Sequence, residues 1–79
     1  MTATVRARTV VFNNWDPVQG LVEREIVFDT IDDLFARCLE IRSGETVDRV
    51  VLDGVDQKGV PRRLTLAFQS ATVSEPLIE

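Results

Sequence analysis

Side chains that could do catalytic chemistry are few in this chain, and their spacing singles out no reacting pair. The sequence has no histidine and no tyrosine, and Cys38 is its only cysteine. Cys38 falls on the apolar side of a predicted helix, without the histidine that would activate a thiolate, so we interpret it as a core residue. Asp29, Asp32 and Asp33 cluster at the start of the same helix, where carboxylates favour the backbone N–H groups. We therefore predict that the chain is not an enzyme.

The acidic residues also form no recognisable metal site. The run DGVDQKG, residues 53–59, contains two aspartates and a glycine, but a calcium loop needs acidic residues at alternate positions and a distal glutamate. With no histidine and one cysteine, four nitrogen or sulfur ligands for zinc cannot be assembled. The sequence predicts no metal and no cofactor.

The only tryptophan lies in a cluster of turn-forming residues, Asn13, Asn14, Trp15, Asp16 and Pro17, which predicts a loop. Such a loop is a candidate site for a small polar molecule or for a protein partner, because loops carry function and tryptophan is common at binding hot spots. The alternative is that Trp15 folds back and plugs one end of a small core.

A second candidate is the one local basic patch, formed by Lys58, Arg62 and Arg63. It could dock a phosphate or an acidic partner. The alternative is a solvated hairpin tip in which Arg63 is paired with Asp53.

Length and charge limit the classes of partner. The chain has 79 residues and a net charge of −4, so we predict a single domain over residues 1–73 with a C-terminal extension at 74–79. The negative charge disfavours nucleic acid and anionic membranes as partners. No apolar run approaches the ~20 residues of a membrane span. The first residues lack a signal-like apolar segment and the lone thiol fits a reducing compartment, so we expect a cytoplasmic protein.

Two β-strands are predicted at residues 4–12 and 21–28 from their alternating β-branched residues. Pairing Arg8 with Glu23 and Arg6 with Glu25 gives two opposite-charge pairs on one face. In this register Arg24 falls on the apolar face. Either it reaches past the sheet edge to solvent, or it is a buried arginine that holds a carboxylate or an anionic ligand.

A helix is predicted from about Ile31 to Arg42. Thr30 is a good N-cap, Asp33 stands in a capping-box position, and Gly44 supplies the C-terminal stop. A broad apolar stripe, made by Ile31, Leu34, Phe35, Cys38, Leu39 and Ile41, predicts that the helix lies on a sheet.

A second hairpin is predicted from strands at residues 47–55 and 63–73. A three-residue loop, Gln57 to Gly59 with Gly59 in the left-handed conformation, joins them. This loop sets Leu52 opposite Leu64, Val50 opposite Leu66 and Asp53 opposite Arg63. Pro61 has no N–H and should therefore lie at a sheet edge.

These elements predict an α+β fold of order ββαββ, in which two β-hairpins form a four-stranded antiparallel sheet with one amphipathic helix packed on one face. The uncovered face and the chain end supply the candidate interface residues. These are Arg6, Arg8, Glu23, Glu25, Val51, Thr65, Leu77 and Ile78.

Since disulfides and zinc are excluded, self-association is the remaining way to stabilise so small a domain. We therefore expect a non-catalytic protein-interaction module that acts as a homo-oligomer, most simply a dimer, through its sheet face or edge. A different protein is a further possible partner. The alternative is a small-molecule-binding domain with a pocket at a subunit interface or under the Trp15 loop. In its patterning, which many α+β domains share, the segment 28–68 resembles small bacterial immunity proteins that neutralise toxins, and no functional residue follows from this resemblance.

Overall fold

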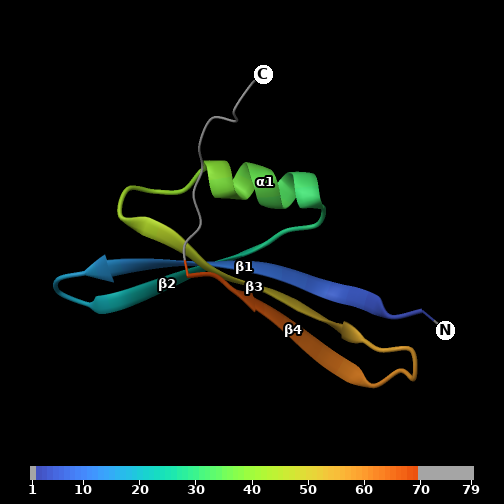
Figure 1. Ribbon diagram of the computed structural model, residues 1–79. Helices are drawn as coiled ribbons and strands as arrows, with labels where there is room; N and C mark the ends of the chain where they lie inside the picture. Colours follow the sequence, from blue (N-terminus) through green and yellow to red (C-terminus); the bar gives the residue numbers. More distant parts are fainter. Residues whose placement is uncertain (1, 70–79) are drawn as a thin grey trace.

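A computed structural model of the chain describes residues 2–69. It contains strands β1 (Thr4–Asp16) and β2 (Gly20–Val27), helix α1 (Ile31–Leu39), and strands β3 (Glu45–Val55) and β4 (Pro61–Ala67). The four strands form one antiparallel sheet of order β2-β1-β3-β4, and α1 lies on one face of it (Figure 1). The predicted α+β fold of order ββαββ is confirmed.

The sheet is staggered around β1, its longest strand. β2 pairs with the second half of β1, from Thr9 to Asp16, whereas β3 pairs with β1 from Thr4 to Asn14. β4 pairs only with residues 49–55 of β3. As a result the two hairpins extend in opposite directions, as Figure 1 shows. The strands β2 and β4 are therefore edge strands at opposite ends of the molecule.

The predicted register of the first hairpin is wrong, because β1 continues through the expected loop. Asp16 closes a tight turn: its Oδ1 accepts hydrogen bonds from the N–H groups of Val18, at 2.7 Å, and Gln19, at 3.0 Å. Gly20 follows with φ +83°, which glycine adopts at no steric cost. Glu23 consequently lies opposite Asn13, and Glu25 lies opposite Val11. The expected pairs of Glu23 with Arg8 and of Glu25 with Arg6 do not form.

The two arginines of β1 also depart from their predicted positions. A register shift between Val5 and Ala7 makes Arg6 an unpaired bulge residue. Arg8 then lies opposite Leu52 on the helix side of the sheet, with its Nη1 3.9 Å from a carboxylate oxygen of Asp29. The placement of Arg8 on the uncovered face is therefore wrong, because the bulge reverses the alternation of side chains along β1.

The second hairpin is confirmed in its loop and its register. Leu52 lies opposite Leu64, Val50 opposite Leu66 and Asp53 opposite Arg63. Gly59 has φ +80°, and its N–H donates to the carbonyl of Asp56 at 3.0 Å. The edge position of Pro61 is confirmed as well, because β4 is the last strand of the sheet.

The helix begins as predicted and ends early. Thr30 is the N-cap: its Oγ1 accepts the Asp33 N–H at 3.1 Å, and the Asp33 carboxylate accepts the Asp29 N–H at 3.1 Å. The helix ends at Leu39 with Glu40 as C-cap, so Arg42 is not helical and Gly44 is not the helix stop. Gly44, with φ +81°, instead belongs to the turn that leads into β3.

The core is small and leaves much of the helix exposed. Its buried cluster comprises Val10, Phe12, Phe28, Val47 and Val50, against which the helix side chains Leu34 and Cys38 pack without being fully buried. Burial raises the pKa of the Cys38 thiol, in agreement with its interpretation as a packing residue. On the other side of α1, Ile31, Phe35 and Leu39 are 74%, 67% and 52% exposed. The predicted apolar stripe is thus divided between a side that contacts the sheet and a side that does not.

Gly54 of β3 leaves no room for a side chain beside β1, and we predict that Gly54→Ala destabilises the fold. A Cβ at this position would lie 2.1 Å from the backbone oxygen of Thr4, and backbone cannot move aside cheaply. We expect the free energy of unfolding to fall by about 1–3 kcal/mol in urea titrations. Thr46→Ala, at an exposed position of the same strand, should change it by less than about 0.5 kcal/mol. Equal losses of unfolding free energy in the two variants would show that β1 and β3 are not in close contact at Gly54.

Candidate interaction surface

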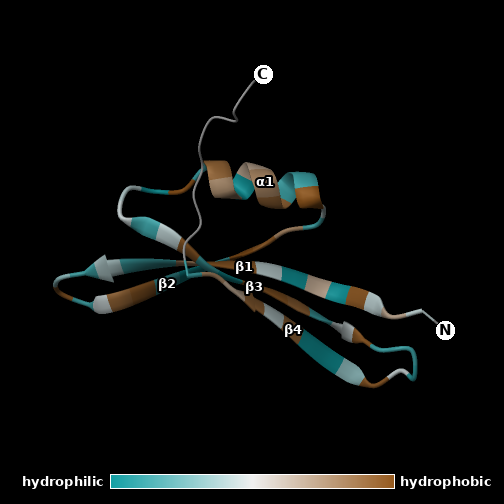
Figure 2. Cartoon of the chain, in the orientation of Figure 1, coloured by the Kyte–Doolittle hydropathy of each residue, from teal (hydrophilic) through white to brown (hydrophobic). Residues whose placement is uncertain are grey.

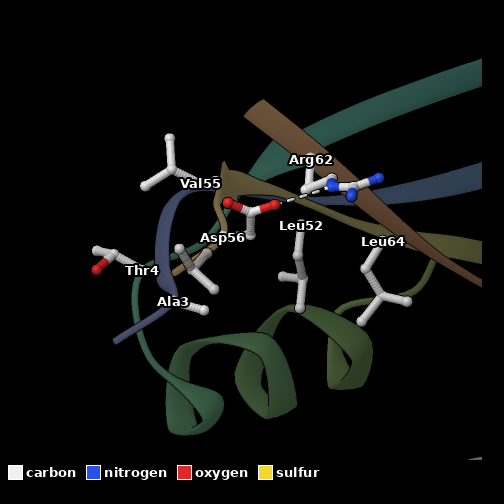
Figure 3. Close-up of a pocket in the computed structure, with 9 residues that line it drawn as sticks. Ala3, Thr4, Leu52, Val55, Asp56, Arg62 and Leu64 are labelled. Carbon is white, nitrogen blue, oxygen red and sulfur yellow. Dashed lines mark hydrogen bonds and ion pairs between the residues drawn. The ribbon is translucent and has the colours of Figure 1, made fainter. Parts of the chain in front are cut away.

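An apolar groove lies between α1 and β4. A hollow of about 280 Å³ has Val5, Leu52, Leu66 and Phe68 on its sheet side and Ile31 and Leu34 on its helix side. A second hollow of about 230 Å³ adjoins it and shares Val5 and Leu52. Figure 3 shows the side chains of Leu52 and Leu64 in this second hollow pointing toward α1. We call the two hollows together the β4 groove, and its apolar lining residues include Val5, Ile31, Leu34, Leu52, Leu64, Leu66 and Phe68.

The β3–β4 register determines which side chains form the floor of this groove. Because Leu52 lies opposite Leu64 and Val50 opposite Leu66, the leucines of β4 share the helix side of the sheet. The helix does not reach them, so Leu64, Leu66 and Phe68 are 53%, 44% and 41% exposed. In Figure 2 apolar and polar residues alternate along α1. Leu34 and Cys38 pack against the core, and Ile31 and Leu34 line the groove.

A partly buried ion pair lies at the other end of the helix-side face. The Arg24 guanidinium donates two hydrogen bonds, of 2.8 and 2.7 Å, to the carboxylate of Glu45, and its carbon lies 4.7 Å from the centre of the Phe12 ring. The Glu45 side chain is only 4% exposed, and that of Arg24 is 26% exposed. The hydrogen bonds from Arg24, together with one from the Arg42 N–H, lower the pKa of Glu45 to about 2.

Of the two alternatives for Arg24, the pair favours an arginine that holds a carboxylate, although the Arg24 side chain is only partly buried. The charge of Arg24 is therefore balanced by Glu45 within the chain, which disfavours Arg24 as the site of an anionic ligand. Glu45 was missed from the sequence, because it lies 21 residues away and just before the predicted start of its strand. No local pattern could have identified it.

The uncovered face of the sheet is polar and internally paired. It carries the predicted residues Glu23, Glu25, Val51 and Thr65, of which Glu25, Val51 and Thr65 line a depression of about 210 Å³. Arg49 lies 3.1 Å from Glu23, and Arg63 donates hydrogen bonds of 2.6 and 3.1 Å to Asp53. The hydrogen bonds from Arg63 lower the pKa of Asp53. Because these arginines have carboxylate partners, the face offers little net charge to a ligand.

Asn13, Asn14, Trp15 and Asp16 belong to β1 and not to a loop. Trp15 is 71% exposed, opposite the exposed Leu21, so its interpretation as a core plug is wrong. The Asp16 carboxylate accepts hydrogen bonds from the backbone N–H groups of the turn, and these hydrogen bonds lower its pKa. None of the three hollows described above is lined by Trp15. A role for these residues in binding remains a prediction.

The basic patch lies at the tip of the second hairpin. Asp56 accepts the N–H groups of Lys58, at 2.8 Å, and Val60, at 3.0 Å, and its other oxygen accepts from the Arg62 side chain at 3.2 Å, as the dashed line in Figure 3 marks. Since Arg63 is paired with Asp53, two of the three cations of the patch have carboxylate partners. The arrangement favours the solvated hairpin tip over a phosphate site.

Other site classes find no support within residues 2–69. No three potential metal ligands converge among them, and the single helix described there is too short and too polar to cross a membrane. The predicted interface residues Leu77 and Ile78 lie outside the described part of the chain.

Comparison with protein-family models, with curated proteins and with solved structures finds no match to this chain. The resemblance of segment 28–68 to immunity proteins therefore gains no support, and the function must be argued from the surface itself.

We predict that the Arg24–Glu45 pair makes the fold acid-sensitive. The folded-state pKa of Glu45, about 2, lies below its ordinary value of 4.5, so its contribution to stability is complete above about pH 4.5 and is lost as the pH falls toward 2. Glu45→Gln should lower the free energy of unfolding at pH 7 by roughly 2–3 kcal/mol, because it leaves Arg24 without its partner. The variant should also lose the part of the pH dependence between pH 4.5 and 2 that Glu45 contributes, while the carboxylates of Asp16 and Asp53, whose pKa values are also lowered, keep theirs.

Urea titrations across this pH range measure both effects. Glu23→Gln, which removes the partner of an exposed pair, serves as the control and should cost less than about 1 kcal/mol. If Glu45→Gln followed the same acid dependence as the unmodified chain, the pair would not be the source of it.

Proposed function

We propose that this chain is a non-catalytic protein-interaction module that self-associates, and that it does so through β4 and the β4 groove. The observation that carries the proposal is the contiguity of the exposed apolar side chains. Leu64, Leu66 and Phe68 on the strand adjoin Ile31 on the helix across one groove. Scattered exposed apolar residues are ordinary, but a contiguous apolar patch marks an interaction site.

The energetics favour an interaction that also stabilises the fold. The described core has only six buried apolar side chains, namely Val10, Val11, Phe12, Phe28, Val47 and Val50. Full burial of one large apolar side chain contributes about 1.5–3 kcal/mol, so covering the half-exposed residues of the β4 groove would add substantially to so small a core. Association that covers the groove stabilises the folded state by mass action.

The second candidate is a small-molecule-binding domain with its pocket at a subunit interface. It is favoured by the hollow of Figure 3, which is mostly apolar and has the Asp56–Arg62 ion pair among its lining residues. Its volume of about 230 Å³ is below the ~300 Å³ at which ligand pockets usually begin. A second subunit would have to complete it.

The site of action is proposed to be the cytoplasm. The support is Cys38, a lone and half-buried thiol, which suits a reducing compartment. If the partner were a different protein and not a second copy, it would contact the same apolar residues of the β4 groove.

The test is the native mass of the chain by light scattering over a hundredfold range of concentration. We expect a dimer that dissociates on dilution. Leu64→Glu, which places a charge on the groove floor at a half-exposed position, should shift the chain to monomer by raising the dissociation constant at least tenfold, with its circular dichroism spectrum unchanged. Val18→Glu, at the exposed tip of the first hairpin, should leave the mass unchanged.

The same samples separate the two candidate functions. A self-associating module should show a melting temperature that rises with its own concentration. A small-molecule binder should ignore its concentration and respond to a panel of metabolites. A monomer at every concentration, with no change in Leu64→Glu, would contradict self-association through the groove.

A further inference from the structure

We infer that β4 pairs antiparallel with the β4 strand of a second copy, about a twofold axis that passes through Thr65. This inference rests on the proposed self-association and specifies its geometry. It follows from the backbone of β4, from the arrangement of its charges, and from a comparison with β2, the other edge strand.

The β3–β4 ladder determines which backbone groups of β4 are free. The Phe68 N–H donates to the carbonyl of Asp48, and the Asp56 N–H donates to the carbonyl of Val60. Hydrogen-bonded and non-hydrogen-bonded pairs alternate in an antiparallel ladder, so Arg62, Leu64 and Leu66 direct their backbone groups toward β3. Arg63, Thr65 and Ala67 direct theirs outward.

The outward groups of β4 are accessible. Every residue of β4 is exposed, and β4 is the last strand of the sheet. Pro61, which has no N–H to donate, falls in the outward phase of the same ladder, where its missing donor breaks no internal bond. Beyond Pro61, β4 therefore presents a row of donors and acceptors that have no partner among residues 2–69, which is a template for another strand.

A register centred on Thr65 uses all three outward residues. Thr65 pairs with Thr65 of the second copy, and Arg63 pairs with Ala67 in both directions. On the helix side the same register sets Leu64 beside Leu66 of the other copy, a cross-strand apolar pair on the floor of the groove. The axis is perpendicular to the sheet, so both helices lie on one face of a continuous sheet.

The charges of β4 fit this direction of pairing. Arg62 and Arg63 stand at one end of the strand, and Ala67 and Phe68 at the other. Antiparallel pairing brings each arginine beside an apolar residue of the second copy, whereas parallel pairing would place arginines side by side. Arg62 and Arg63 also have internal partners, Asp56 and Asp53, so neither has to be neutralised by the second copy.

The other edge strand is not self-complementary. In β2 the residues in the outward phase include Glu23 and Glu25, and antiparallel pairing of two β2 strands would set glutamates against glutamates. Pairing β2 of one copy with β4 of another would match opposite charges, but it would be a head-to-tail contact that continues without closing. The twofold β4 contact closes with two copies, and this is the assembly that we propose.

Thr65 gives a direct test, because it would face its own copy across the axis. Thr65→Lys should weaken the dimer by placing two ammonium groups opposite each other, and Thr65→Glu should do the same with two carboxylates. An equimolar mixture of the two variants should form a heterodimer that is about tenfold tighter than either homodimer. Native mass spectrometry measures the three species, and Thr46→Lys with Thr46→Glu, exposed on β3 away from β4, is the matched control pair.

Each outcome decides the inference. Weak homodimers, a restored heterodimer and no preference in the Thr46 pair support it. If the unmodified chain dimerises and the Thr65 variants dimerise equally well, alone or mixed, the β4 pairing is wrong. Self-association itself is then still supported. Growth beyond two copies also overturns the β4 pairing, in favour of the head-to-tail contact, and an unmodified chain that is monomeric at millimolar concentration overturns both proposals.

Discussion

Which part of the sheet stays exposed depends on one constraint: the single helix is narrower than the four-stranded sheet. A helix with its side chains is about 10 Å across, whereas four strands spaced at about 4.8 Å span about 14 Å between the axes of the outer strands. The single helix of nine residues covers the part of the sheet formed by Val10, Phe12 and Val47, and it leaves the leucines of β4 open. The stagger of the two hairpins adds to the mismatch, because β4 pairs with the end of β3 that lies farthest from the first hairpin.

The two ends of the helix-side face differ. One end is covered by an ion pair, and the other end leaves apolar side chains exposed. At one end Arg24 lies over the Phe12 ring and is paired with Glu45, so a long polar side chain takes the place of an apolar one. At the other end Leu64, Leu66 and Phe68 line the open groove and remain about half exposed. A polar pair of this kind is satisfied within one chain, whereas an apolar surface is satisfied only by something placed over it. This difference is why we assign the interaction to β4.

Several features could be predicted because a few adjacent residues determine them. The loop at Gly59 and the register it imposes were correct, since a three-residue loop with a left-handed glycine leaves one pairing of the flanking strands. The N-cap at Thr30 was correct for the same reason. In the first hairpin the two charge pairs suggested a register, but such pairs contribute only about 0.2–1 kcal/mol each. The turn closed by Asp16 and Gly20 determined the pairing instead.

The sequence by itself therefore determined the order of the elements, the start of the helix and one complete hairpin, all of which rest on contacts between near neighbours. The tertiary structure alone decided the strand order, the bulge at Arg6, the partner of Arg24 and the side of the helix that stays exposed. Each of these depends on residues that are distant in the chain and meet only when the two hairpins align along β1. Packing between distant segments leaves no periodic or local trace in a single sequence, so the groove beside β4 could be recognised only in three dimensions.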